Sequence, residues 1–100
     1  MQINLIERDE IISDIRKIIP VDSGIQLFRV YVKGTYITVD FYFTMSYWTF
    51  DRRALIYEPM NELVNSDKYK DFYTIDYNVH KLKDDDLKHC SNLMVFNNKI

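Results

Sequence analysis

A strict alternation of apolar and polar side chains constrains the fold of this chain more than any other feature. The pattern runs over residues 25–33, is interrupted at Lys33-Gly34, and resumes over residues 35–45. A period of two is typical of strands with one buried face. One face would carry Phe28, Val30, Val32, Ile37, Val39, Phe41, Phe43 and Met45. The other face would carry Leu27, Arg29, Tyr31, Lys33, Tyr36, Thr38, Asp40, Tyr42 and Thr44.

We therefore expect an antiparallel hairpin with an apolar inner face and an outer face of tyrosines and charges. A two-residue turn at Lys33-Gly34 would pair Val30 with Ile37 and Phe28 with Val39. The alternation of both strands agrees with that register. Contact with another protein, or coverage by the second half of the chain, would account for the tyrosines of the outer face.

A helix is predicted ahead of the hairpin, over residues 5–19. Asn4 and Glu7 form a cap-like Asn-x-x-Glu sequence, and Pro20 ends the helix. Arg8 interrupts an apolar stripe that is otherwise formed by Leu5, Ile11, Ile12, Ile15, Ile18 and Ile19. This stripe is the natural cover for the apolar face of the hairpin.

Residues 46–58 allow two interpretations. Tyr47, Trp48 and Phe50 could form a third strand, followed by a turn at residues 51–53 and a short strand over residues 54–57. The rival interpretation starts a helix at Asp51. Pro59 argues against one unbroken helix, because proline removes a hydrogen bond and clashes inside one. We expect the helix to begin at about residue 59, with proline in its first position and with an inward face of Met60, Leu63 and Val64.

The last third of the chain is predicted to add a strand to the sheet. Residues 65–71 lack apolar periodicity and should be the frayed end of the helix or a loop, whereas residues 72–80 alternate as a strand does. A short closing helix or strand could contain Leu87, Leu93, Met94 and Phe96. The predicted fold is a single α+β domain over residues 1–100. In it, an N-terminal helix packs on a mainly antiparallel sheet with a second helix and late strands.

Composition argues against several classes of function. The chain has a net charge of −2 and no basic stripe, which is unlike a nucleic-acid-binding protein. Cys90 is the only cysteine, so no internal disulfide can form. The N-terminal residues do not resemble a signal peptide, and no apolar run approaches the ~20 residues of a membrane span. We expect a cytoplasmic protein that contacts neither nucleic acid nor a membrane.

No catalytic or metal-binding pattern stands out. His80, His89 and Cys90 are the only soft metal ligands, and they lack the paired spacing of a zinc site. Ser91 follows Cys90, but neighbours in sequence do not form a triad, and no Gly-x-Ser-x-Gly elbow is present. Two isolated glycines cannot form a phosphate-binding loop. We therefore expect a binding protein with no cofactor and no metal, and not an enzyme.

The acidic excess lies in the second half of the chain. Residues 58–86 hold eight acidic and four basic residues, a net charge of −4. Acids combined with tyrosines suit a surface that fills a basic nuclease cleft, because carboxylates pair with Lys and Arg while the rings supply contact area. The alternative is a merely exposed acidic edge. The candidate partner-binding residues are Asp71, Tyr73, Asp76, Tyr77, Asp84, Asp85 and Asp86.

The order of features over residues 5–64 resembles the YezG-like group of small bacterial immunity proteins. The shared features are an Ile18-Ile19-Pro20 step after the first helix, the hairpin over residues 25–45, Tyr57, and the Asn61-Glu62-Leu63 patch. The resemblance implies a cytoplasmic immunity protein (antitoxin) of a polymorphic or contact-dependent growth inhibition system. Such a protein occludes a cognate toxin, often one that cuts RNA or DNA.

A hypothesis from another class remains open beside the immunity function. The chain could be a self-associating structural or regulatory adaptor without a toxin partner. Its two-fold contact would then be formed by exposed tyrosines of the outer face, namely Tyr31, Tyr36 and Tyr42.

Overall fold

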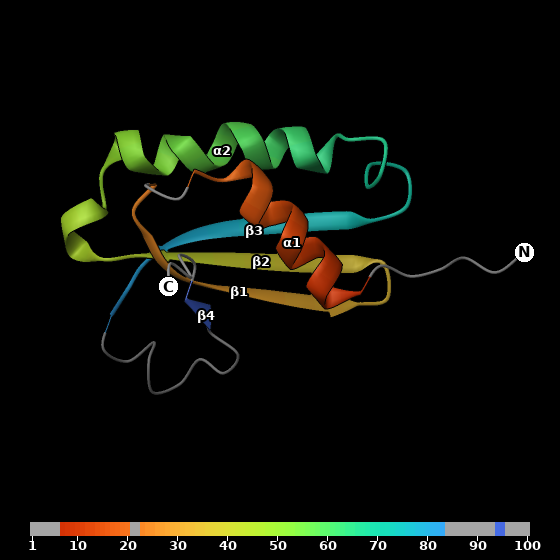
Figure 1. Cartoon of the computed structure of the whole chain (residues 1–100), viewed down its shortest axis with the longest axis horizontal. Helices are drawn as coiled ribbons and strands as arrows, with labels where there is room; N and C mark the ends of the chain where they lie inside the picture. Colours follow the sequence, from red (N-terminus) through yellow and green to blue (C-terminus); the bar gives the residue numbers. More distant parts are fainter. Residues whose placement is uncertain (1–6, 21–22, 84–93, 96–100) are drawn as a thin grey trace, which may run out of the picture.

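The computed structural model describes residues 7–20, 23–83 and 94–95, and it has the predicted α+β architecture (Figure 1). The helices are α1 (Arg8–Ile18), the 3₁₀ turn η1 (Met45–Tyr47) and α2 (Phe50–Val64). The strands are β1 (Ile25–Lys33), β2 (Tyr36–Phe43), β3 (Thr74–Lys81) and β4 (Met94–Val95). Of the residues predicted for a closing element, Leu87, Leu93 and Phe96 lie outside the described residues, while Met94 lies in β4.

The sheet is mixed, with strand order β3-β2-β1-β4. β1 pairs antiparallel with β2 and with β4, as expected for a mainly antiparallel sheet. β2 and β3 are parallel, because the chain crosses over through α2 before it re-enters the sheet. The sequence pattern predicts β3 as a strand but does not indicate its direction.

The hairpin turn lies one residue later than predicted. Lys33 pairs with Tyr36 across a two-residue turn at Gly34-Thr35, so Val30 pairs with Val39 and not with Ile37. Gly34 has φ +60°, a conformation that glycine adopts without strain. The predicted register is wrong by two positions. Such a shift leaves every side chain on its expected face, so the alternation could not reveal the difference.

A bulge at the start of β1 brings one more apolar residue onto the inner face. The register shifts between Ile25 and Leu27, where Ile25 pairs with Phe43 and Leu27 with Tyr42. Without the extra residue Gln26, strict alternation would place Ile25 on the outer face. The bulge therefore explains why Ile25 joins the buried core beside Phe43.

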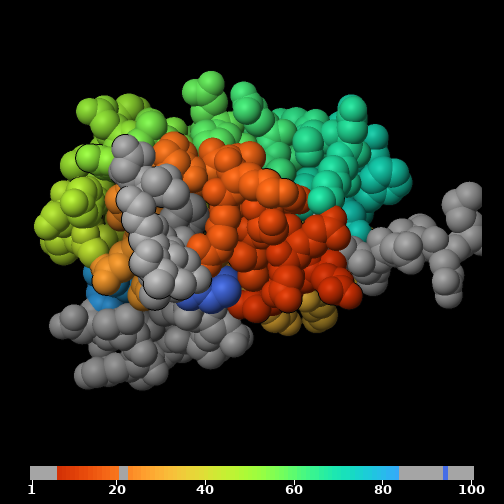
Figure 2. Space-filling model, viewed as in Figure 1, coloured from red at the N-terminus to blue at the C-terminus, as the bar shows by residue number. Residues whose placement is uncertain are grey.

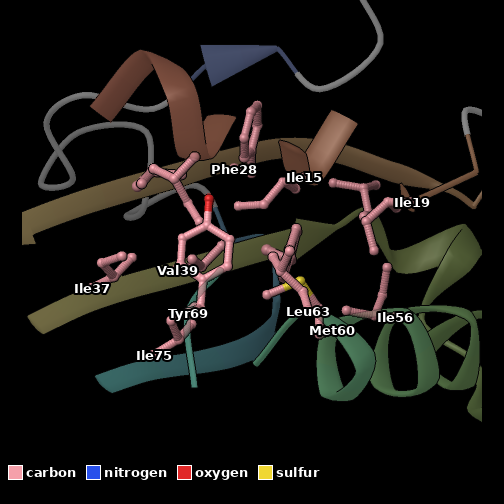
Figure 3. Packing of buried hydrophobic residues seen from close by; sticks show 14 of the residues in the cluster. Ile15, Ile19, Phe28, Ile37, Val39, Ile56, Met60, Leu63, Tyr69 and Ile75 are labelled. Carbon is pink, nitrogen blue, oxygen red and sulfur yellow. The ribbon is translucent and has the colours of Figure 1, made fainter. Parts of the chain in front are cut away.

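Both helices pack on the inner face of the sheet, where α1 contacts β1 and α2 contacts β3. Figure 3 shows Ile15 of α1 and Met60 of α2 converging on Val39 of β2. The buried cluster consists of Ile11, Ile15, Ile19, Ile25, Phe28, Val30, Ile37, Val39, Phe41, Phe43, Ile56, Met60, Leu63, Tyr69 and Ile75. The inward face predicted for the second helix is confirmed, since Met60 and Leu63 are buried and Val64 packs against the cluster.

The structure overturns the preferred interpretation of residues 46–58. Thr49 caps α2 by accepting a hydrogen bond from the backbone N–H of Arg52 at 3.2 Å, and Pro59 lies inside the helix. The strands expected at residues 47–50 and 54–57 are therefore wrong, and the rival helix is nearly right. Burial of Ile56 together with Met60 compensates for proline, whose interior position costs about 3 kcal/mol. The carbonyl that loses its hydrogen-bond donor belongs to Leu55, a residue on the exposed side of α2.

Arg8, which interrupts the predicted apolar stripe, ties α1 to the sheet. Its Nε donates to the carbonyl of Val30 at 2.9 Å, and its Nη2 lies 3.6 Å from Sδ of Met94. α1 begins at Arg8 with Glu7 as N-cap, and no side chain caps it. The cap-like Asn4 lies outside the described residues.

Candidate functional site

The outer face of the sheet contains a buried carboxylate at its centre. Asp40 of β2 is only 5% exposed and lies between Arg29 of β1 and Asn78 of β3 in the register. Arg29 donates to Oδ2 of Asp40 from Nη2 at 2.7 Å and from Nε at 3.2 Å. Oδ1 lies 2.9 Å from Nε2 of His80 and 3.4 Å from Nδ2 of Asn78. We call Arg29, Asp40, Asn78 and His80 the Asp40 cluster.

The Asp40 cluster holds its carboxylate in the ionised form. Burial by itself raises the pKa of Asp40, but the hydrogen bonds from Arg29 and His80 outweigh it, and the resulting pKa lies below the ordinary value. A buried carboxylate with an arginine and two further side-chain partners, Asn78 and His80, is a fully satisfied network. Its chemistry is therefore that of a structural anchor between β1, β2 and β3.

A carboxylate–histidine pair also occurs in catalytic sites, where the histidine needs a reacting group within hydrogen-bond reach. The His80 ring stacks on Tyr42, with ring centroids 4.9 Å apart. The adjoining pocket of about 510 Å³ is lined by Tyr42, Trp48, Val79, His80, Lys81 and Lys83. None of these described lining residues is a serine, a cysteine or a carboxylate, the groups that a carboxylate-paired histidine most often serves.

The structure separates the candidate partner-binding residues predicted from sequence. Asp76 lies on the outer face of β3, where its carboxylate accepts a hydrogen bond from the Tyr36 hydroxyl. Tyr73 and Tyr77 lie on the helix side, since both pack against the inner core. Asp71 is exposed in the turn before β3. Asp84, Asp85 and Asp86 lie outside the described residues.

Tyr69 belongs to the same acidic, tyrosine-rich segment, but it is a core residue. Its side chain is fully buried, and its hydroxyl donates to Asp14 of α1. Burial and this hydrogen bond raise the pKa of Tyr69 well above its ordinary value. Lys68 joins the same carboxylate, with Nζ 2.8 Å from Oδ2 of Asp14. The loop after α2 is therefore fastened to α1 through Lys68 and Tyr69.

The residues that share an exposed surface with Tyr77 come from α2 instead. The Tyr77 hydroxyl donates to Oδ1 of Asn61 at 2.7 Å, and its ring lies 6.3 Å from that of Tyr57. A shallow pocket of about 530 Å³ runs along the outward side of this helix (α2 is green in Figure 2). It is lined by Ala54, Tyr57, Glu58, Asn61, Glu62 and Asn65, which we call the α2 stripe.

Sequence reasoning missed the α2 stripe because residues 54–57 were expected in a strand. Once a single helix spans residues 50–64, the spacing of three and four residues places these six side chains on one face. This spacing of three and four residues was the feature of the sequence that could have revealed the α2 stripe. Apolar exposed residues adjoin the stripe at the start of α2, where Phe50 is 73% exposed and Leu55 is also exposed.

The tyrosines expected to mediate self-association do not form one exposed patch. Tyr31 and Tyr36 are exposed, but Tyr42 is only 4% exposed and lies between Leu27 and His80 in the register. Tyr42 therefore cannot contribute to a surface contact of the kind that its outward position suggested.

Within the described ranges, no three His, Cys, Asp or Glu side chains gather in a way that could hold a metal ion. No helix in that part of the chain has the length and hydropathy to cross a membrane. Comparisons of the chain with protein-family models, with curated proteins and with solved structures found no match.

Proposed function

We propose that this protein is a bacterial immunity protein that binds and neutralises a cognate toxin in the cytoplasm. It would act by binding and not by catalysis, and its target would be a nuclease with a basic active site. The observation that carries the proposal is the α2 stripe, an exposed surface on a regular helix that combines tyrosine with two carboxylates.

The charges of the α2 stripe support a basic target. Glu58 and Glu62 are one helical turn apart and exposed, and neither forms an ion pair with another described residue. Carboxylates in this position can pair with the lysines and arginines that a nuclease uses to hold phosphates. The nearest arginines of α2 are occupied elsewhere, since Arg52 lies over the Tyr47 ring and Arg53 over the Trp48 ring.

The geometry of the α2 stripe supports a tight contact. Tyr77 is held by its hydrogen bond to Asn61, and the Tyr57 ring lies beside it, so both rings lose little conformational freedom on binding. A helix with exposed apolar residues at one end fits a groove on a partner. Phe50 and Leu55 would extend the apolar part of that contact.

A first experiment would identify the partner. Tagged full-length protein is used to capture binding proteins from its native cell lysate, and the recovered protein is identified by mass spectrometry. We expect one stoichiometric basic protein whose expression alone arrests growth and whose co-expression with this chain does not. Growth arrest that persists on co-expression would overturn the proposal.

A second experiment would locate the contact. In the Glu58→Lys/Glu62→Lys variant we expect about 100-fold weaker binding at low salt, because two attractive charges become repulsive. The matched control is Asp67→Lys/Asp71→Lys, which makes the same charge change in the exposed loop before β3. Equal loss in both variants would indicate non-specific attraction. Loss in the control alone would return the contact to the segment predicted from sequence.

A further inference from the structure

The two edges of the sheet differ in length and regularity. One edge is closed by β4, which has two residues. The other edge is β3, which has eight residues and pairs with β2 in an unbroken register from Thr74 to Lys81. Among the described strands, none pairs with the outward side of β3.

The backbone hydrogen bonds of β3 show which groups this edge presents. The N–H of Thr74 donates to the carbonyl of Thr35 at 2.9 Å, and the N–H of Leu82 donates to that of Phe43 at 2.7 Å. Because alternate residues of a parallel strand bond to the same neighbour, even-numbered residues of β3 face β2. The N–H and C=O groups of the odd-numbered residues therefore point outward, at Ile75, Tyr77, Val79 and Lys81.

β3 lacks the features that usually prevent an edge strand from pairing. Natural edges are blunted by proline, by bulges, by short length or by a lysine within the strand. The strand sequence TIDYNVHK contains no proline, its register contains no bulge, and its one lysine is the last residue. Such an edge is a ready template for one more strand.

The charges along β3 indicate which strand would fit. Acidic residues lie at its beginning, with Asp71 just before the strand and Asp76 in its third position. Basic residues lie at its end, with His80 and Lys81 in the strand and Lys83 just after it. A second copy of β3 in antiparallel orientation, centred on Asn78, would place Asp76 of each strand opposite His80 of the other.

We propose that two copies of this protein pair through their β3 edges, antiparallel and related by a two-fold axis at Asn78. In this register, Tyr77 lies opposite Val79 of the second copy and Ile75 lies opposite its Lys81, which are outward-facing positions that exchange backbone hydrogen bonds. Asp76 lies opposite His80 of the second copy, and this pair occurs twice. Even residues meet even residues, so the helices of both copies cover the same side of one continuous sheet.

The dimer uses the backbone groups of the β3 edge, whereas the proposed toxin contact uses the carboxylates of the α2 stripe, and Tyr77 adjoins both surfaces. Either proposal can therefore fail alone. A two-fold contact of one patch with itself is the commonest way in which identical chains associate.

Sedimentation of the full-length protein over a range of concentrations is the test. We expect a monomer–dimer equilibrium whose dissociation constant rises about tenfold or more in Asn78→Lys and in Asn78→Glu, because residue 78 lies opposite itself at the two-fold axis and each variant places two like charges together. An equimolar mixture of the two variants should regain most of the affinity, since the new lysine of one copy then faces the new glutamate of the other. Misfolding of either variant could not be corrected by mixing. Lys33→Glu, at the far end of β1, is the control for a charge change away from the β3 edge.

Hydrogen exchange of the wild-type chain gives a second measurement. The amides of Ile75, Tyr77, Val79 and Lys81 should exchange quickly in dilute protein and become protected as the dimer forms. A monomer at every concentration would overturn the proposal. A dimer that is insensitive to both variants, or whose outward amides stay unprotected, would do so equally.

Discussion

The two faces of β2 are both buried, but by different physical means. On the inner face, Val39 and Phe41 are fully buried in an apolar cluster. On the outer face, Asp40 between them is 5% exposed and is buried among charged and polar partners. Apolar burial is non-directional and does not depend on protonation, whereas a buried carboxylate is stable only while its partners remain in place. The comparison shows that one strand can use both forms of stabilisation at adjacent positions.

The largest expected effect belongs to the inner face. Phe41→Ala should lower the free energy of unfolding by about 4 kcal/mol, because it removes a buried ring and leaves a cavity. The ring of Phe28, stacked 6.4 Å from that of Phe41, would lose its neighbour. Urea unfolding measures the change, and Phe41→Leu is the milder control. A loss below 1 kcal/mol would mean that the inner face is not well packed.

The centre of the outer face should come second. Asp40→Ala should lower the free energy of unfolding by about 2 kcal/mol, because Arg29 and His80 lose a shared partner but remain partly exposed to water. Arg29→Met, which keeps the chain packing and removes the charge, should cost less than Asp40→Ala. The same urea experiment compares them. An Asp40→Ala loss equal to that of Phe41→Ala would erase the distinction between the faces.

The dependence of stability on pH distinguishes the two faces further. The pKa of Asp40 in the folded protein lies below its ordinary value, so the unfolded chain takes up the proton first as pH falls. The contribution of Asp40 is therefore complete above about pH 4 and is lost as pH falls through the folded-state pKa. In thermal unfolding, Asp40→Asn should reduce the fall of the melting temperature at acidic pH. Phe41→Ala should leave the slope of melting temperature against pH unchanged. An unchanged slope in Asp40→Asn would contradict the assignment.

The rim of the outer face should show the smallest effect. Tyr36→Phe removes a hydroxyl that donates to Asp76 at an exposed position, and it should change the free energy of unfolding by less than about 0.5 kcal/mol. A much larger loss would mean that the outer network extends as one unit from Asp40 to the rim.

Much of this arrangement could be predicted from local sequence. Alternation over residues 25–45 correctly assigned every described side chain from Leu27 to Phe43 to its face, even though the register was wrong by two positions. The burial of Asp40 could not be predicted, because it depends on Asn78 and His80, which β3 supplies from about forty residues away. A pattern within one strand contains no information about partners at that distance.

Pro59 alone explains why the α2 stripe was not predicted from the sequence. Proline inside a helix has a free-energy cost, so Pro59 argues for a helix start at that residue. The burial of Ile56 against α1 and the sheet opposes this cost. That gain exists only in the folded protein, so the sequence pattern could not weigh the two. With the helix start placed too late, Tyr57 and Glu58 were not recognised as one face with Asn61 and Glu62.

The parallel pairing of β2 with β3 also has a consequence for the order of events during synthesis. The hairpin of β1 and β2 is a local structure, which can form as soon as both strands are available. β3 is separated from β2 by the whole of α2 and must close a much longer loop before it pairs. A nascent chain that has not reached residue 78 therefore has Asp40 with Arg29 alone and one side of β2 unpaired. At this stage β2 presents the open edge that β3 covers in the finished protein.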